Sequence, residues 1–146
     1  IDDNTLTRLT ADRFEFLLAL LWKKQNYSVV RTPQSGDKGA DVVAILGNAG
    51  VLIQCKSSAN ETGGLNREAL GDILTAAGYY GKAHPGVKFS LICATNQRFN
   101  GTTKTLANDN NIKLIEQNDI LELLLKTPIT LEELNHMARC QCVDIE

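Results

Sequence analysis

The sequence lacks the features that mark membrane proteins, secreted proteins and repeat proteins. No apolar run reaches the length of a membrane span, and no signal peptide is recognisable. There is also no internal repeat and no low-complexity segment. With 146 residues, 43% of them hydrophobic, the chain is long enough for one domain with a buried core. We therefore expect a globular domain without a membrane partner.

A surplus of positive charge is missing as well. The net charge is −2, and even without the acidic segment 130–146 the remaining residues carry only +1. Proteins that bind nucleic acid by themselves are usually more basic than this. If the chain acts on a nucleic acid, another domain or subunit is expected to supply much of the affinity for phosphate.

The chain has only four cysteines, and they do not form a disulfide or zinc pattern. Cys55 and Cys93 fall within predicted strands, where a cysteine behaves as a small buried apolar residue. Cys140 and Cys142 form a lone Cys-x-Cys, whereas a structural zinc site needs four ligands and only two histidines are available to complete it. Nothing requires an oxidising compartment, so we expect a cytoplasmic location.

Hydrophobic periodicity predicts alternating helices and strands. Residues 10–26 have an apolar stripe at helical spacing, and Glu15 lies at its edge. Shorter apolar runs bounded by turn residues predict the strands. The predicted order is helix 10–26, strands 27–32, 41–46 and 51–57, helix 67–82, strand 87–95, a short helix ending near 110, strand 112–116, helix 118–126 and a last helix from 130. This order predicts an α/β fold with a mixed central β-sheet flanked by helices.

One stretch carries a recognisable chemistry. A turn-rich segment leads to Asp41 at the start of one predicted strand, and Gln54-Cys55-Lys56 lies in the next strand. Because side chains alternate along a strand, Gln54 and Lys56 share one face and Cys55 points to the other. If the two strands form a hairpin, Asp41 reaches the same edge. A carboxylate, an amide oxygen and an ammonium would then converge, as metal-assisted cleavage of a phosphodiester requires.

These residues resemble a known family. Asp41 followed by Gln54-x-Lys56 resembles the D…QxK form of the PD-(D/E)xK nuclease site, and the surrounding SGDxGxD…QCK resembles the Mrr-like type IV restriction endonuclease catalytic domain. Glu15, which follows Phe14 on the first helix, resembles the helix-borne glutamate of that family. The resemblance covers about residues 10 to 126 and implies a restriction-endonuclease-like core. Lys38 and Ala40 depart from the usual pattern of the turn but are not among the proposed ligands.

The expected site is a metal centre for phosphodiester hydrolysis. Asp41 and Gln54 would hold Mg²⁺ together with the backbone carbonyl of Cys55, and Mn²⁺ would be able to substitute. Since an amide oxygen replaces the usual carboxylate, we expect weak metal binding. Lys56 would orient the attacking water and stabilise the transition state. The resemblance implies that Glu15 assists directly or from outside the ligand shell. The alternatives are a turn aspartate, a solvated lysine and a glutamate on the solvated flank of its helix.

Further polar residues near the expected cleft are candidates for contacts with a DNA backbone. Each of them is equally compatible with a solvated surface role. They are Ser35, Lys38, Arg67, Arg98 and Lys104.

The sequence and the resemblance together predict the organisation of the protein. We expect an N-terminal extension or linker at 1–9, the nuclease catalytic domain at 10–128, and a C-terminal helix and tail at 129–146. Because the sequence begins with Ile1 and not Met, we expect it to be part of a longer protein. The resemblance implies DNA as substrate, a separate recognition domain and defence against foreign or modified DNA, and a homodimer would allow both strands to be cut.

Three other functions remain open from the sequence. The chain could be an inactive DNA-binding or regulatory module that keeps the nuclease fold. It could be a nuclease with another task, such as junction resolution or effector-triggered cleavage. It could also be an interaction domain in which the motif is accidental.

Overall fold

A computed structural model describes residues 1–32, 39–57 and 68–140 of the chain. The elements along the chain are α1 (Asp3–Arg8), α2 (Ala11–Lys23), β1 (Ser28–Arg31), β2 (Val42–Leu46), β3 (Ala49–Lys56), α3 (Glu68–Ala83), β4 (Lys88–Thr95), α4 (Gly101–Asp109), β5 (Ile112–Ile115), α5 (Gln117–Lys126) and α6 (Leu131–Cys140). Each predicted strand and helix is present, with ends shifted by a few residues. The helix α1 was not predicted. No helix within the described ranges is long and apolar enough to cross a membrane.

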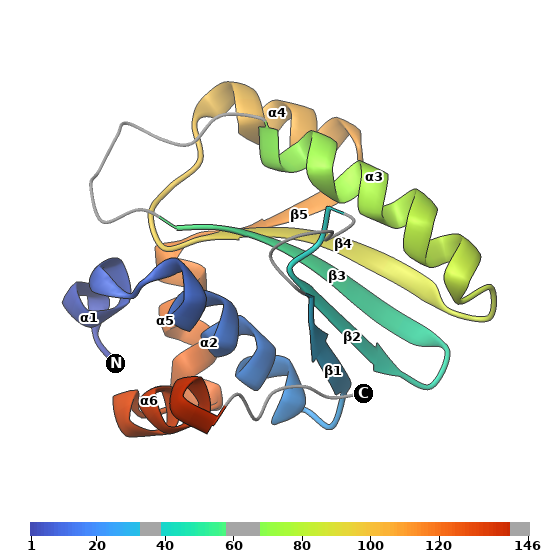
Figure 1. The fold of residues 1–146 in the computed structure, drawn as a ribbon. Helices are drawn as coiled ribbons and strands as arrows, with labels where there is room; N and C mark the ends of the chain where they lie inside the picture. The colour runs from blue at the N-terminus through green and yellow to red at the C-terminus, as the bar shows by residue number, and fades with distance from the viewer. Residues whose placement is uncertain (33–38, 58–67, 141–146) are drawn as a thin grey trace.

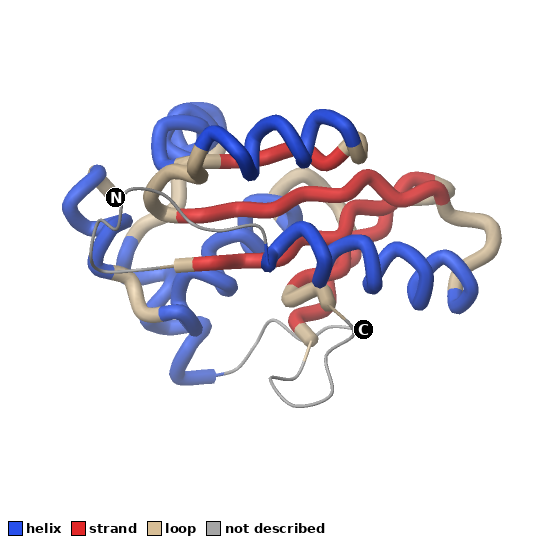
Figure 2. Tube along the Cα trace, turned by 90° about the horizontal axis from the view of Figure 1, so that it is seen from above, coloured by secondary structure: helices blue, strands red, loops and turns tan. Residues whose placement is uncertain are grey.

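The strands form a mixed sheet in the order β1-β2-β3-β4-β5 (Figure 1), and Figure 2 shows the same sheet from above. The first three strands are antiparallel neighbours, and β3, β4 and β5 run parallel. A two-residue turn joins β2 to β3, whereas the parallel strands are connected through α3 and α4. The expected mixed sheet flanked by helices is therefore confirmed.

Helices cover both faces of the sheet and enclose two cores (Figure 1). One face packs against α2, with α1, α5 and α6 around it, and the other face packs against α3 and α4. Alternation along β3 supplies both cores, because Val51 and Ile53 belong to the first and Leu52 to the second. The same alternation carries on to Gln54, Cys55 and Lys56.

Helix α2 is enclosed over most of its length. Thr10 caps its first turn by accepting a hydrogen bond from the backbone of Arg13, and Asn26 turns the chain beyond its end with a φ of 73°. All nine residues from Phe14 to Trp22 are buried, because the sheet covers one side of the helix and α6 the other. Glu15 is therefore a carboxylate inside the protein and not on a solvated flank.

The two ends of the chain contribute to the first core. In α1, Leu6 is fully buried, and the side-chain amide of Asn96 donates hydrogen bonds to the carbonyls of Leu6 and Thr7 at 3.2 and 3.1 Å. At the other end, Leu134 of α6 is fully buried in the same core, and Arg13 of α2 donates to Asn135 at 2.8 Å. The helices α1 and α6 thus belong to the same packed core as α2 and α5.

Candidate active site

The site begins where the hairpin of β2 and β3 opens. Val42 pairs with Ile53, so Asp41 lies opposite Gln54. The backbone N–H of Asp41 donates to the carbonyl of Ile53 at 2.8 Å, and the N–H of Cys55 donates to Oδ2 of Asp41 at 2.8 Å. These two hydrogen bonds bracket Gln54 and hold the buried carboxylate of Asp41 against β3.

The chain before Asp41 is fixed on two sides. The backbone N–H of Thr32 donates to the carbonyl of Asp41 at 2.9 Å, and its hydroxyl donates to the carbonyl of Ala40 at 2.7 Å. On the other side, Gly39 has a φ of +94° and lies so close to α3 that a Cβ would stand 2.0 Å from the carbonyl oxygen of Asp72. Only glycine adopts this conformation in this space without strain.

Gln54 presents an unusual polar atom. Its side chain is buried, and its Oε1 atom has no hydrogen-bond partner among the described residues. A buried acceptor without a partner costs about 1–3 kcal/mol, so such atoms are rare in folded proteins. A cation held between Gln54 and Asp41 would satisfy this oxygen.

Lys56 lies on the same face of β3 as Gln54 and reaches α3. Its Nζ atom is 3.7 Å from Oδ2 of Asp72, with side-chain exposures of 36% and 48%. An ion pair with this exposure contributes about 0–1 kcal/mol, so it holds the ammonium only weakly. Cys55 points to the opposite face and packs against the core around α2, as the alternation predicted. No pattern in the sequence indicated Asp72, which comes close to Lys56 only through the packing of α3.

Glu15 enters the site from α2 and is paired with Arg31 of β1. The Nε atom of Arg31 donates to Oε1 of Glu15 at 2.9 Å, and the guanidinium also contacts Asp12. Burial raises the pKa of Glu15 to about 7, the nearby charge of Asp41 adds to the rise, and Arg31 opposes it. The same surroundings, with burial first and then Asp41 and Glu15, raise the pKa of the Cys55 thiol. Glu15 and Asp41 are therefore electrostatic neighbours although they lie on different elements.

The donor set fits a hard divalent cation. Asp41 and Glu15 supply carboxylate oxygens, Gln54 an amide oxygen, and the backbone at Cys55 a carbonyl oxygen, which are the ligands that Mg²⁺ prefers. Among the residues that the structure describes, no three His, Cys, Asp or Glu side chains are grouped to hold a metal. A cation at this place would accordingly depend on Gln54 and on a backbone carbonyl.

The candidate DNA contacts are only partly described. Ser35, Lys38 and Arg67 lie outside the described residues, as do the cysteine at 142 and the side chain of the cysteine at 140. Arg98 is exposed in the loop after β4, whose end lies beside that of β3 because Lys56 pairs with Thr95. Lys104 on α4 forms an ion pair with Glu116 at 3.4 Å.

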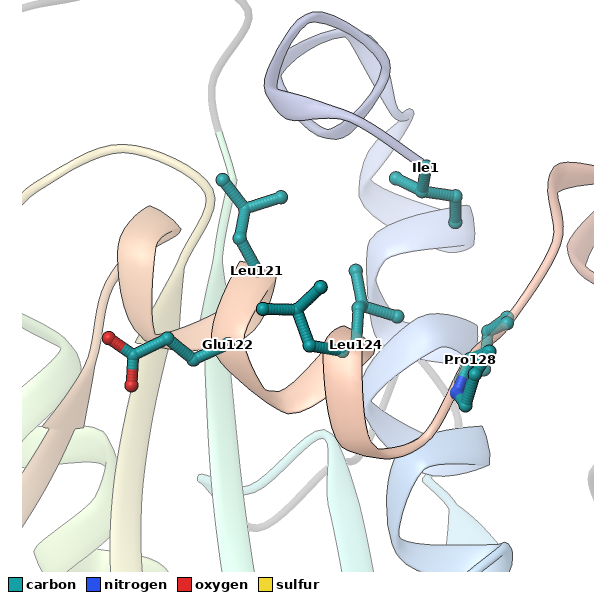
Figure 3. A pocket seen from close by; sticks show the side chains of 7 residues that line it. Ile1, Leu121, Glu122, Leu124 and Pro128 are labelled. Carbon is teal, nitrogen blue, oxygen red and sulfur yellow. The ribbon is translucent and has the colours of Figure 1, made fainter.

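The pocket in Figure 3 is separate from these residues. It is mostly apolar and has a volume of about 300 Å³. Its lining comes from the N-terminus, α5 and the segment after α5, namely Ile1, Leu121, Glu122, Leu124, Leu125, Pro128 and Ile129. With a single carboxylate and none of the predicted site residues, it is not the candidate active site.

Comparison with known proteins identifies the family. The family model Mrr_cat, described as a restriction endonuclease, matches residues 6–124. The chain belongs to this restriction endonuclease family. The resemblance read from the sequence is thereby confirmed, and membership of the family supports a nuclease role.

Solved structures share the fold of this restriction endonuclease domain. MspJI restriction endonuclease, solved in complex with a 27-mer oligonucleotide, is 14% identical with a TM-score of 0.56, over 92% of this chain and 32% of the MspJI chain. A protein of unknown function, AF1548, is 19% identical with a TM-score of 0.55, over 90% of this chain and 78% of its own. The chain thus spans about a third of MspJI. No curated protein matches the chain significantly.

Proposed function

We propose that the chain is a Mg²⁺-dependent endonuclease domain that hydrolyses DNA phosphodiester bonds. The observation that carries the proposal is the buried Oε1 atom of Gln54, which has no hydrogen-bond partner in the described part of the chain and lies opposite the carboxylate of Asp41, with Lys56 two residues further on the same face. A structural glutamine would be expected to find a partner for its carbonyl oxygen. A metal ligand needs that oxygen to be open to the cation.

The residues have distinct tasks in this mechanism. Asp41, Gln54 and the backbone carbonyl of Cys55 hold the cation, and Glu15 adds a carboxylate from α2. When bound, a divalent cation polarises the scissile phosphate and makes water a better nucleophile. The ammonium of Lys56 orients the attacking water and lies where negative charge develops on the phosphate. Water attacks phosphorus in line, and the 3′ oxygen leaves without a covalent enzyme intermediate.

Recognition of the target is proposed to come from other regions. The net charge of −2 provides little general attraction for DNA, which supports a separate recognition domain in the full-length protein. Within the chain, the exposed Arg98 near the carboxyl ends of β3 and β4 is the described candidate for a phosphate contact. A homodimer would place two sites on the two strands. Restriction of foreign or modified DNA in the cytoplasm is the proposed biological role.

Plasmid cleavage tests the proposal directly. The purified chain is incubated with supercoiled DNA and Mg²⁺ or Mn²⁺, with EDTA as the metal-free control. Lys56→Ala is compared with Lys88→Ala, which removes an exposed lysine at the other end of the parallel strands. We expect metal-dependent nicking that Lys56→Ala abolishes and Lys88→Ala retains.

Calorimetry separates the other outcomes. Metal binding that is lost in Asp41→Asn, without plasmid cleavage, would support the site and direct the search to methylated, branched or RNA substrates. If the chain neither binds metal nor cuts any of these substrates, the proposal is wrong, and an inactive binding module with the nuclease fold takes its place.

A further inference from the structure

Arg31 is a cation placed between two segments of the site. It is the last residue of β1, next to Thr32, whose backbone and hydroxyl hold the chain at Ala40 and Asp41. Its side chain reaches Glu15 and Asp12 of α2. The helix α2 packs beside β1 (Figure 1). The end of β1 therefore contacts both proposed acidic ligands. The backbone of Thr32 binds the backbone of Asp41, and the side chain of Arg31 binds the side chain of Glu15.

The guanidinium is held in a fixed orientation. Its Nε atom donates to Glu15 at 2.9 Å, one Nη group contacts Asp12, and its Cζ atom lies 4.4 Å from the centre of the Phe16 ring. The side chain of Arg31 is only 19% exposed. A planar group that binds two carboxylates and stacks on a ring has little freedom to rotate, so it restricts the carboxylates that it binds.

Glu15 needs such a restraint because of its surroundings. It is 5% exposed, and Asp41 is the acid whose charge acts on it most strongly. Two carboxylates that approach the same point repel each other, and a buried one without a counter-charge rotates away or takes up a proton. A metal site requires instead that the carboxylates of Glu15 and Asp41 are both held in position before the cation binds.

We propose that Arg31 is a positioning residue of the metal site, which fixes the Glu15 carboxylate beside Asp41 and thereby raises the affinity for a divalent cation. This inference rests on the proposed function, because it assumes that a cation binds there. Residues that orient metal ligands from outside the ligand shell commonly change metal affinity or activity by about 10- to 100-fold when mutated.

A positioning role and a purely electrostatic role of Arg31 predict opposite changes in cation affinity when Arg31 is removed. Arg31 is itself positive, so Coulomb repulsion alone would make its removal tighten the binding of a cation. Positioning predicts that its removal weakens binding, because the Glu15 carboxylate loses the hydrogen bond and ion pair to Arg31. The sign of the change in affinity therefore distinguishes the two, provided that each variant is folded under the conditions of the measurement.

The experiment is a double-mutant cycle on Mn²⁺ affinity, measured by calorimetry. Arg31→Gln is made in the wild-type chain and in Glu15→Gln, and Lys23→Gln removes an exposed charge at the end of α2 as the matched control. We expect Arg31→Gln to weaken Mn²⁺ binding at least tenfold in the wild-type chain, and to cause no weakening in Glu15→Gln. Arg31→Lys keeps the positive charge but lacks the planar guanidinium that binds two carboxylates. This variant should therefore also weaken Mn²⁺ binding.

Thermal unfolding of each variant shows whether it is folded, and the double variant avoids an unpaired buried charge. The inference is overturned if Arg31→Gln leaves Mn²⁺ affinity unchanged or tightens it, if it weakens binding equally without Glu15, or if Arg31→Lys binds like the wild-type chain. A wild-type chain that binds no Mn²⁺ would instead refute the metal site, and the inference with it.

Discussion

The ionisation of Glu15 should make the stability of the metal-free chain depend on pH. The pKa of this carboxyl is about 7 in the folded chain against an ordinary value of 4.5, because of burial and the charge of Asp41. Between these two values the folded state binds more protons than the unfolded state. The free energy of unfolding therefore falls as the pH rises from below 4.5 through 7.

The size of this effect follows from the two pKa values. Each unit of difference is worth about 1.4 kcal/mol, which sets an upper limit of about 3.4 kcal/mol for the whole shift. Between pH 5 and pH 8, linkage gives a loss of about 2.5 kcal/mol from this group. Glutamine at this position cannot ionise, so the contribution should be absent from Glu15→Gln.

Urea unfolding in EDTA at pH 5, 6, 7 and 8 measures the difference. Subtracting the Glu15→Gln curve from the wild-type curve removes most contributions of other groups. The difference in free energy of unfolding should fall by about 2–3 kcal/mol across this range. Saturating Mg²⁺ should reduce the fall, since a cation favours the ionised carboxylate. A difference that stays constant or rises with pH would refute the reasoning about the surroundings of Glu15.

Three other substitutions test the site and its support. Gln54→Glu replaces the amide with a carboxylate, so Mg²⁺ binding measured by calorimetry should tighten; unchanged binding would argue against direct ligation. Gly39→Ala places a Cβ against the carbonyl of Asp72 at a positive φ, so the free energy of unfolding in urea should fall by about 1–3 kcal/mol. Gly86→Ala is the control, because a Cβ at that position meets no other atom, and it should not destabilise the chain. Asn96→Ala removes the two hydrogen bonds to carbonyls of α1 and should cost about 1–3 kcal/mol in urea unfolding, with faster amide exchange in α1. Unchanged exchange would show that α1 is held by other contacts.

The fold and the core of the site follow from local patterns in the sequence. The period of two along β3 already places Gln54 and Lys56 on one face and Cys55 on the other, and the short turn between β2 and β3 allows only an antiparallel pairing. These two facts bring Asp41 opposite Gln54. The order Glu15, Asp41, Gln54-x-Lys56 was sufficient to indicate the family, which the match over residues 6–124 confirms.

Contacts between distant segments could not be read in the same way. Periodicity put Glu15 at the edge of an apolar stripe, and only the packing of α6 and the sheet around α2 made it a buried residue. Its partner Arg31 and the partner of Lys56, Asp72, each lie at least 16 positions away along the chain. An arginine at the end of a strand and an aspartate on a helix look the same in sequence whether or not they face a site.

The sequence by itself thus determined which side chains could form the site, because alternation and a tight turn act over a few residues. The tertiary structure alone decided how these side chains are charged and held. That difference has a physical reason: burial, electrostatic repulsion between Glu15 and Asp41, and the restraint by Arg31 all depend on which elements pack together, and packing is a property of the whole chain.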